Sequence, residues 1–267
     1  MPVPADRPTL SQALLRNATA ELPWPAPLVV ASTGSTNADV LARAASGAPE
    51  GLVIAADEQT AGRGRLGRTW ASPPGASVSV SVLLRPPFGH PQLGWLPLLT
   101  GLAVAAGVQK AAGVAAAVKW PNDVLVDSGL PGKIAGVLLE GADGAAAVGF
   151  GINTAMTADE LPVEQASSIV LAQAPPPDPN VLVAACLLQL YRRYSALVAA
   201  GGDAQRSGLA QEYRDRCSTI GRSVTVSLPD GAVLSGSAQD VDADGRLLVA
   251  VPEGVIAVSA GDVAHVR

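Results

Sequence analysis

The pattern of apolar residues changes at Gly221, and this change constrains the fold more than any other feature of the sequence. Before it, short apolar stretches of strand length alternate with longer ones such as 96–112 and 181–198. After it, short alternating segments follow one another between turns such as 240–245. The first pattern predicts a mixed α/β body. The second predicts a small all-β module of about five strands, in the size range of an SH3-like barrel.

We therefore expect three parts, namely an N-terminal extension at 1–27, a body at 28–219 and a C-terminal module at 220–267. In the extension, Thr9 followed by Gln12 predicts a helix over 9–21 that begins with a capping box.

The body is expected to contain six strands and four helices. The predicted strands are 28–31, 51–56, 78–84, 124–126, 134–140 and 145–150. The predicted helices are 37–45, 96–112, 181–198 and 209–221. Ala142, Asp143 and Gly144 predict a hairpin turn, and residues 57–68 form a polar loop rich in glycine and arginine.

Charge and composition exclude several classes of protein. The net charge of −5 does not favour binding to nucleic acid through phosphate neutralisation. Cys186 and Cys217, taken with the two histidines, do not have the spacing of a metal site. The longest uncharged apolar run, 93–108, is shorter than the ~20 residues of a membrane span. The N-terminus lacks the pattern of a signal peptide, so we expect a soluble, cytoplasmic protein.

Residues 59–68 contain three glycines and three arginines. Glycines let the backbone approach a ligand closely, and guanidinium groups bind phosphate or carboxylate. The segment is not a Walker A loop, because the Gly-Lys-Ser/Thr ending is missing. Its alternative interpretation is a solvated basic turn.

Three further segments carry polar residues at strand ends. Residues 33–37 follow a strand and open a helix, which suits either a small polar ligand or plain capping. Residues 119–123 place a lysine and an aspartate on either side of a turn. These side chains could bind a metal-bound nucleotide, or the segment could be a purely structural turn. Lys133 lies in an apolar segment, where it needs an anionic partner unless it extends to solvent at the strand end.

The order and spacing of these segments, followed by Gly-Ile-Asn at 151–153 and a small β module, resemble the biotin–protein ligase family. The resemblance covers the chain from about Leu28 to the C-terminus. It implies an α/β catalytic domain similar to that of class II aminoacyl-tRNA synthetases, with an SH3-like C-terminal domain.

The resemblance also implies roles for individual residues. Those expected to bind biotin are Ser35, Thr36, Asn37, Gln59, Arg63, Gly64, Arg65, Lys133 and Gly136. Those expected to bind the nucleotide are Arg65, Trp70, Lys119, Asn122, Asp123 and Asn153. Arg63, Arg65 and Lys133 are expected to act in catalysis, and Asp123 to hold Mg²⁺.

The implied activity uses ATP and biotin as substrates and Mg²⁺ as cofactor. It forms biotinyl-5'-AMP and transfers biotin to a lysine of the biotin carboxyl carrier domain of an acyl-CoA carboxylase. Some family members carry an N-terminal winged helix that binds an operator. Residues 1–27 are too few for one, so we expect no repressor function and no nucleic-acid partner.

Two other functions fit part of the pattern. A lipoate ligase or octanoyl transferase shares the architecture, but the transferase needs a nucleophilic cysteine, and neither cysteine lies in a motif. A non-catalytic biotin sensor would not need the phosphate-binding residues. The sequence offers no evident general base for the acceptor amine, and it leaves the oligomeric state and the identity of the carrier open.

Overall fold

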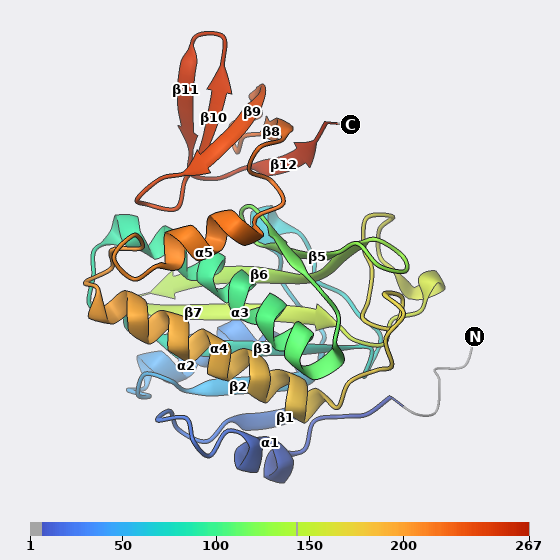
Figure 1. Ribbon diagram of the computed structural model, residues 1–267. Helices are drawn as coiled ribbons and strands as arrows, with labels where there is room; N and C mark the ends of the chain where they lie inside the picture. The colour runs from blue at the N-terminus through green and yellow to red at the C-terminus, as the bar shows by residue number, and fades with distance from the viewer. Residues whose placement is uncertain (1–6, 143, 267) are drawn as a thin grey trace.

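The computed structural model describes residues 7–142 and 144–266, which form two β-sheets and five α-helices (Figure 1). The larger sheet has seven strands in the order β1-β2-β3-β7-β6-β5-β4. Its strands are β1 (Leu28–Thr33), β2 (Val53–Gln59), β3 (Ser77–Leu84), β4 (Ala117–Lys119), β5 (Asp123–Val126), β6 (Gly132–Ala142) and β7 (Ala145–Asn153). The α-helices are α1 (Gln12–Ala18), α2 (Thr36–Ala45), α3 (Trp95–Ala112), α4 (Pro179–Ala199) and α5 (Leu209–Arg216).

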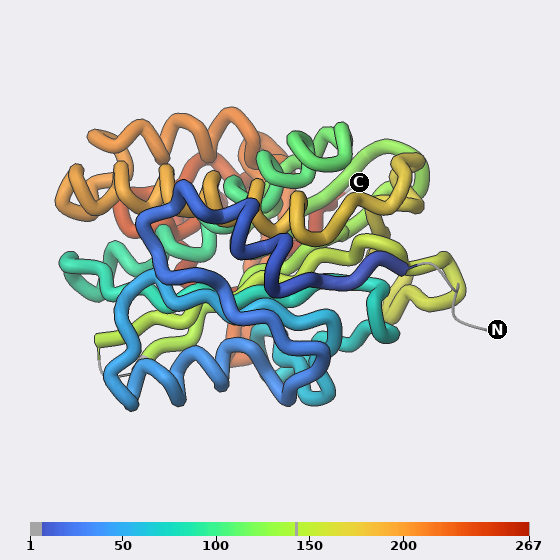
Figure 2. Tube along the Cα trace, turned by 90° about the horizontal axis from the view of Figure 1, so that it is seen from below, coloured from blue at the N-terminus to red at the C-terminus, as the bar shows by residue number. Residues whose placement is uncertain are grey.

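Helices cover both faces of this sheet, as the view along the layers shows (Figure 2). Strand residues alternate between the two faces. On β2, Val53 and Ala55 join the large core that includes α3 and α4, whereas Ile54 joins a smaller cluster with Val40 of α2. Strand β3 is buried along its whole length. The sheet is therefore the middle layer of an α/β/α body.

Helices α3 and α4 are long and apolar enough to cross a membrane by length and composition alone. In the fold, α3 packs against α4 and against strands of the larger sheet. Most of α3 is buried, including Trp95, Leu99 and Val104. This burial is that of core helices, so their hydropathy does not by itself indicate a membrane span.

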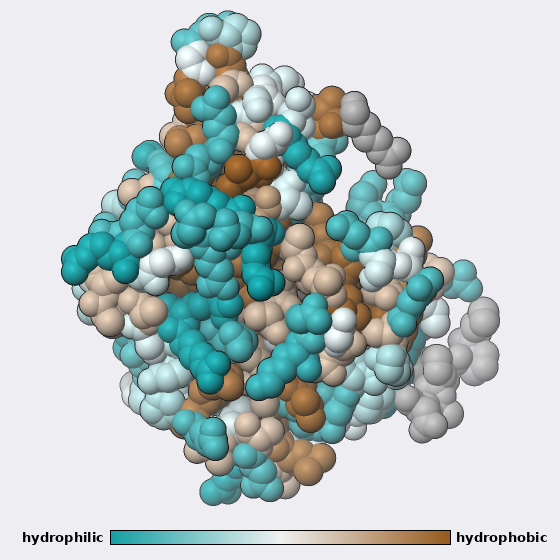
Figure 3. Space-filling model, viewed as in Figure 1, coloured by the Kyte–Doolittle hydropathy of each residue, from teal (hydrophilic) through white to brown (hydrophobic). Residues whose placement is uncertain are grey.

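The C-terminal residues form an antiparallel five-stranded sheet in the order β11-β10-β9-β8-β12. Its strands are β8 (Ser223–Ser227), β9 (Val233–Val241), β10 (Leu247–Val251), β11 (Gly254–Val258) and β12 (Asp262–His265). The sheet projects from the body as a separate lobe whose outer tip is hydrophilic (Figure 3). Two body tryptophans bind its β9–β10 turn, since Trp95 Nε1 donates to Ala243 O (2.8 Å) and Trp120 Nε1 to Gly245 O (3.0 Å).

The predicted fold class, a mixed-sheet α/β body with a small all-β C-terminal module, is confirmed. Most predicted elements agree with the structure to within a few residues at each end, and Asp143 of the predicted hairpin turn lies outside the described residues. We propose the domain limits 28–219 and 220–267, because α5 ends at Arg216 and β8 begins at Ser223.

Three predicted elements have wrong limits. The first helix begins after Ser11, which caps it, and not at Thr9, because Gln12 instead bonds to Pro27 O and Val29 N. Strand β2 extends through residues predicted as loop, because it continues to pair with β1 as far as Gln59.

The predicted helix 209–221 ends at Arg216. Cys217 is extended there, and Ser218 N donates to Val118 O (2.8 Å), so the chain pairs with β4. Strand β4 itself was not predicted. Pairing with a distant segment therefore overrides the local preference, which was for loop at 57–59 and for helix at 217–218.

Gly107 allows α3 and α4 to approach closely. A Cβ at this position would lie 2.9 Å from the Cα and N of Cys186. We therefore expect Gly107→Ala to destabilise the protein by about 1–3 kcal/mol, although alanine is the better helix former. Urea denaturation would measure the free energy of unfolding.

Gly101 of the same helix is the matched control. A Cβ there would meet Val118 Cγ1 at 3.4 Å, an ordinary contact. Gly101→Ala should be neutral or stabilise by up to about 1 kcal/mol. Equal effects at the two positions would contradict the close-packing explanation.

Candidate active site

The parallel pairing of β1 and β2 brings together two segments that are distant in the sequence. Thr33 and Gln59 are paired at the carboxyl ends of these strands. The chain after β1 turns into α2, whose N-terminus begins at Thr36 after the capping residue Ser35. Polar residues of 35–37 therefore lie beside Gln59 at one edge of the sheet.

These residues form a buried, uncharged network. Thr36 N donates to Gln59 Oε1 (2.9 Å), and Gln59 Nε2 donates to Ser79 Oγ (3.1 Å). Ser81 Oγ lies 2.7 Å from Thr36 Oγ1 and 2.6 Å from Asn37 Oδ1. Because buried polar groups need such partners, the network fixes the orientation of its amides and hydroxyls. This end of the site suits a neutral polar ring.

Glycines on β6 and β7 make room for the indole of Trp70. Gly136 and Gly151 are paired across the two strands. A Cβ on Gly151 would lie 2.6 Å from Trp70 Cε2, and one on Gly136 would lie 3.2 Å from Trp70 Cζ3. The Lys133 ammonium is 5.7 Å from the centre of the indole. Trp70 thus lies against the strand backbones beside a cation.

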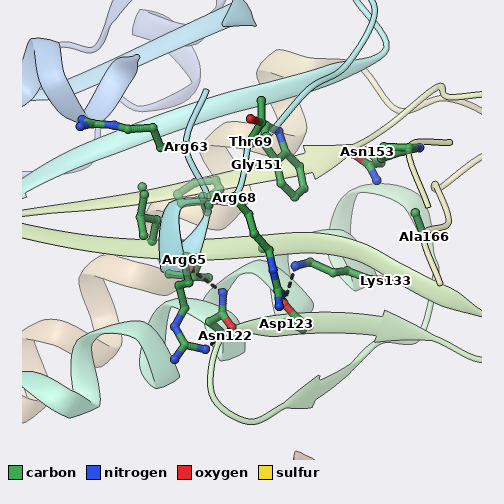
Figure 4. A pocket seen from close by; sticks show the side chains of 18 of the residues that line it. Arg63, Arg65, Arg68, Thr69, Asn122, Asp123, Lys133, Gly151, Asn153 and Ala166 are labelled. Carbon is green, nitrogen blue, oxygen red and sulfur yellow. Dashed lines mark hydrogen bonds and ion pairs between the residues drawn. The ribbon is translucent and has the colours of Figure 1, made fainter. Parts of the chain in front are cut away.

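The opposite end of the site is cationic (Figure 4). Lys133 Nζ lies 2.5 Å from Asp123 Oδ1, and Arg65 Nη1 donates to Asn122 Oδ1 (3.2 Å). Lys133 and Asp123 therefore form a close ion pair. Arg65 comes from the Gly/Arg loop (residues 62–70), Asn122 directly precedes β5, Asp123 begins β5, and Lys133 lies on β6.

The C-terminal module also supplies groups to this end. Arg65 donates to Gly261 O (3.3 Å), and Arg68 forms an ion pair with Asp262. Asp262 and Val263 lie among the residues that line the site. The Gly/Arg loop therefore bridges the body and the C-terminal lobe.

Burial of these cations affects their pKa values. Desolvation lowers the pKa of Lys119, Lys133 lowers it further, and Asp123 acts in the opposite direction. Desolvation also lowers the pKa of Arg65, against the attraction of Asp262 and Asp123. Several positive charges are held where solvent stabilises them poorly. A bound anion such as phosphate would relieve this cost.

A loop after β7 forms the remaining wall. Asn153 Nδ2 donates to Ser167 O (2.9 Å), and Lys133 N donates to Gln165 O (2.8 Å). Farther out, Glu160 forms an ion pair with the buried Arg7. The N-terminal segment thus fixes the outer part of this loop.

All the residues predicted for the site line one cavity of about 510 Å³. They are Ser35, Thr36, Asn37, Gln59, Arg63, Gly64, Arg65, Trp70, Lys119, Asn122, Asp123, Lys133, Gly136 and Asn153.

Other residues line the cavity without having been predicted for it, among them Ser81, Gly149, Gln165 and Asp262. Gly151 lines it too and lies in the Gly-Ile-Asn segment, for which the sequence predicted a role at Asn153 alone. The alternation of serine with valine in β3 contains a signal for Ser81, because it places serines on one face of the strand. No local pattern marks Asp262 or Gln165.

Comparisons with known proteins agree with this geometry. Residues 29–155 match the family model described as the Biotin/lipoate A/B protein ligase family, and residues 219–266 match that of the Biotin protein ligase C terminal domain. The chain is 42% identical to the Biotin--[acetyl-CoA-carboxylase] ligase of Mycobacterium tuberculosis, over 98% of this chain and 97% of that protein. It is 31% identical to the Bifunctional ligase/repressor BirA of Bacillus subtilis, over 88% of this chain and 71% of the relative.

Solved structures share the fold. A biotin protein ligase from Aquifex aeolicus in complex with biotin and ATP superposes with a TM-score of 0.72 at 24% identity, over 90% of this chain and 98% of that one. A biotin protein ligase from Leishmania major in complex with biotinyl-5-AMP superposes with a TM-score of 0.57 at 24% identity, over 88% of this chain and 98% of that one.

His265 of β12 is connected to the site through Thr219. Thr219 Oγ1 accepts from Trp120 N (3.1 Å) and lies 3.2 Å from His265 Nε2. Burial, with Lys119 and Arg222 nearby, lowers the pKa of His265 from 6.5 to about 4. Between these values the unfolded chain binds more protons at this residue than the folded protein does.

We therefore expect stability to fall as the pH decreases from about 6.5 to about 4, by less than about 1.4 kcal/mol per pH unit from this residue. His265→Gln should reduce this acid-induced loss. Denaturation of both proteins at pH 7, 5.5 and 4.5 would test it, and parallel losses would show that His265 does not contribute.

Proposed function

Because this chain belongs to the biotin protein ligase family, we propose that it forms biotinyl-5'-AMP from biotin and ATP and transfers the biotinyl group to a lysine of a biotin carboxyl carrier domain. The observation that carries the proposal is the polarity of the cavity. One end is lined mainly by uncharged hydrogen-bonding side chains, with Arg63 held there by its ion pair with Glu140. The other end is lined by Arg65, Lys119 and Lys133. A neutral ring with a carboxylate tail, placed next to a triphosphate, matches this distribution of charge.

In the first step, a carboxylate oxygen of biotin attacks the α-phosphorus of ATP, and pyrophosphate leaves. Two negatively charged groups must approach each other, and cations held in place before the reaction offset their repulsion. We assign this role to Lys133 and Arg65. Arg63 of the same loop is the third catalytic cation we propose, and it would have to leave its ion pair with Glu140 to reach the phosphates. Trp70 and Asn153 would contact the adenine, while Lys119 and Asn122 would hold the phosphates.

Mg²⁺ is the cofactor we propose for this step, and Asp123 is its protein ligand. The residues present fit such an ion, because the carboxylate of Asp123 lines the cationic end of the cavity. The ion would take the place of Lys133 Nζ, which lies 2.5 Å from Asp123 Oδ1. Mg²⁺ bound with nucleotides typically uses one or two carboxylates together with phosphate oxygens. When bound, it would neutralise charge on the phosphates of ATP.

In the second step, the amine of the carrier lysine attacks the acyl carbon, and AMP leaves. The adenylate must be protected from water and from other amines until then. The Gly/Arg loop at 62–70 is suited to this, since Arg65 and Arg68 attach it to the C-terminal lobe. We further propose that the partner is a carrier domain of an acyl-CoA carboxylase and that the protein acts in the cytoplasm, where its free cysteines stay reduced.

The first test is biotin-dependent exchange of labelled pyrophosphate into ATP by the purified protein. We expect exchange with biotin and none with lipoate or octanoate, because the uncharged network offers hydrogen bonds that only the biotin ring can use. Exchange with lipoate in place of biotin would assign the chain to the lipoate branch. No exchange with any acid would favour a non-catalytic sensor.

A second test concerns the loop. Arg65→Gly removes the contacts with Asn122 and Gly261, so adenylation should continue at a rate reduced by about 10²–10³ while the adenylate escapes. Biotinylation of an added bystander protein, divided by adenylate formed, would measure escape.

Leu66→Gly is the matched control, because Leu66 is exposed and has a positive φ of 54° that suits glycine. It adds flexibility to the loop without removing a guanidinium group. If both variants release the adenylate equally, the contacts of Arg65 are not what retains it.

A further inference from the structure

Glu140 of β6 lies directly behind the uncharged end of the cavity. Its Oε2 accepts a hydrogen bond from Asn37 Nδ2 (2.8 Å) and lies 3.2 Å from Nη2 of Arg63. Glu140 is not among the residues that line the cavity, whereas Asn37 and Arg63 are. It therefore contacts two site residues from outside, one on α2 and one on the Gly/Arg loop.

The contacts of Asn37 determine which way its amide points. A side-chain amide has two N–H donors and one oxygen with two lone pairs. Both donors of Asn37 are used, one by Glu140 and one by Leu138 O at 3.2 Å. The oxygen lies 2.6 Å from Ser81 Oγ, which leaves it with one lone pair free.

The surroundings give this orientation little freedom. Asn37 is 4% exposed, and Ser81 is fully buried. A Cβ on Gly149 would lie 2.4 Å from Asn37 Oδ1, so the oxygen occupies space that only a glycine leaves open. Asn37, Ser81 and Gly149 all line the cavity, so the oxygen lies at its wall. If the amide turned over, its NH₂ would face the Ser81 hydroxyl, and its oxygen would face the Glu140 carboxylate, where two acceptors cannot bond.

We propose that Glu140 is a positioning residue that fixes the oxygen of Asn37 toward the cavity and thereby selects a ligand ring carrying an N–H donor. The inference rests on the proposed function, in which that ring is the cyclic urea of biotin. Glu140 touches no substrate. It acts by occupying the donors of Asn37, so that the free lone pair of the oxygen accepts from a ring N–H.

The ion pair with Arg63 has the smaller part in this role. The Arg63 side chain is 49% exposed, and exposed ion pairs contribute little. Arg63 also points away from Lys133 and Asp123 (Figure 4). The hydrogen bond to Asn37 is buried, so its loss should dominate the effect of removing the carboxylate.

Isothermal titration calorimetry of the full-length protein with biotin and, separately, with ATP tests the proposal. Glu140→Ala should raise the Kd for biotin by on the order of tenfold, because a buried donor loses its partner and the amide is released. The Kd for ATP should stay within about twofold, since the nucleotide end is unaltered. Glu140→Gln keeps an oxygen for Asn37, so its Kd for biotin should remain near that of the unaltered protein.

Glu212→Ala is the matched control. Glu212 forms an ion pair with Arg193 between α4 and α5, and neither residue lines the cavity, so removal of Glu212 should change neither Kd. If Glu140→Ala does not fold, Glu140→Met, which keeps the length of the side chain without an oxygen, carries the same expectation.

The outcomes separate the inference from the proposed function. An unchanged Kd for biotin, an equal rise for both ligands, or a Glu140→Gln variant as weak as Glu140→Ala would overturn the positioning role alone. No binding of biotin by the unaltered protein would overturn the proposed function, and the inference with it.

Discussion

The parallel pairing of β1 with β2 is the interaction on which the site depends. It is the one parallel pair among the strand pairs of the described sheets. Because the two strands run in the same direction, the start of α2 and the end of β2 meet at one edge. Hairpin connection of the same strands would have placed Thr36 and Gln59 at opposite edges. The uncharged end of the cavity is therefore a consequence of topology.

The cationic end has a different physical origin. Lys119 and Arg65 are partly desolvated beside Lys133, with Asp123 and Asp262 as the nearby carboxylates. Such an arrangement costs free energy in the empty protein. Bound anions neutralise these cations and remove the free-energy cost of burying them, which strengthens anion binding. The fold thus holds in place, before substrates bind, the positive charge that the proposed adenylyl transfer from ATP requires.

The C-terminal lobe has both a structural and a functional contact with the body. Trp95 and Trp120 bind its β9–β10 turn through their indole N–H groups. Arg65 and Arg68 reach Gly261 and Asp262 from the loop over the cavity. The first pair of contacts fixes where the lobe sits. The contacts of Arg65 and Arg68 connect the lobe to the loop that lines the cavity, so a displacement of the lobe would also displace the wall of the site.

Much of the fold was readable from the sequence, because periodicity and turn residues are local properties. The buried helix α3 and the all-β module that follows Gly221 were both predicted. The errors occurred where distant pairing decided the structure. Residues 57–59 were predicted as loop but are strand, because they pair with β1. Residues 217–218 were predicted as helix but are extended, because they pair with β4.

The candidate site divides in the same way. Glycine, arginine and lysine within short motifs marked its chemistry, and all the predicted residues line one cavity. The sequence could not mark Asp262, which comes from another lobe, or Glu140, which acts from behind Asn37. The chemical groups of the site, and the elements that carry most of them, follow from local patterns in the chain. Which of these groups face each other follows from the folding of distant segments, because hydrogen bonds and ion pairs depend on distances between segments far apart in the chain.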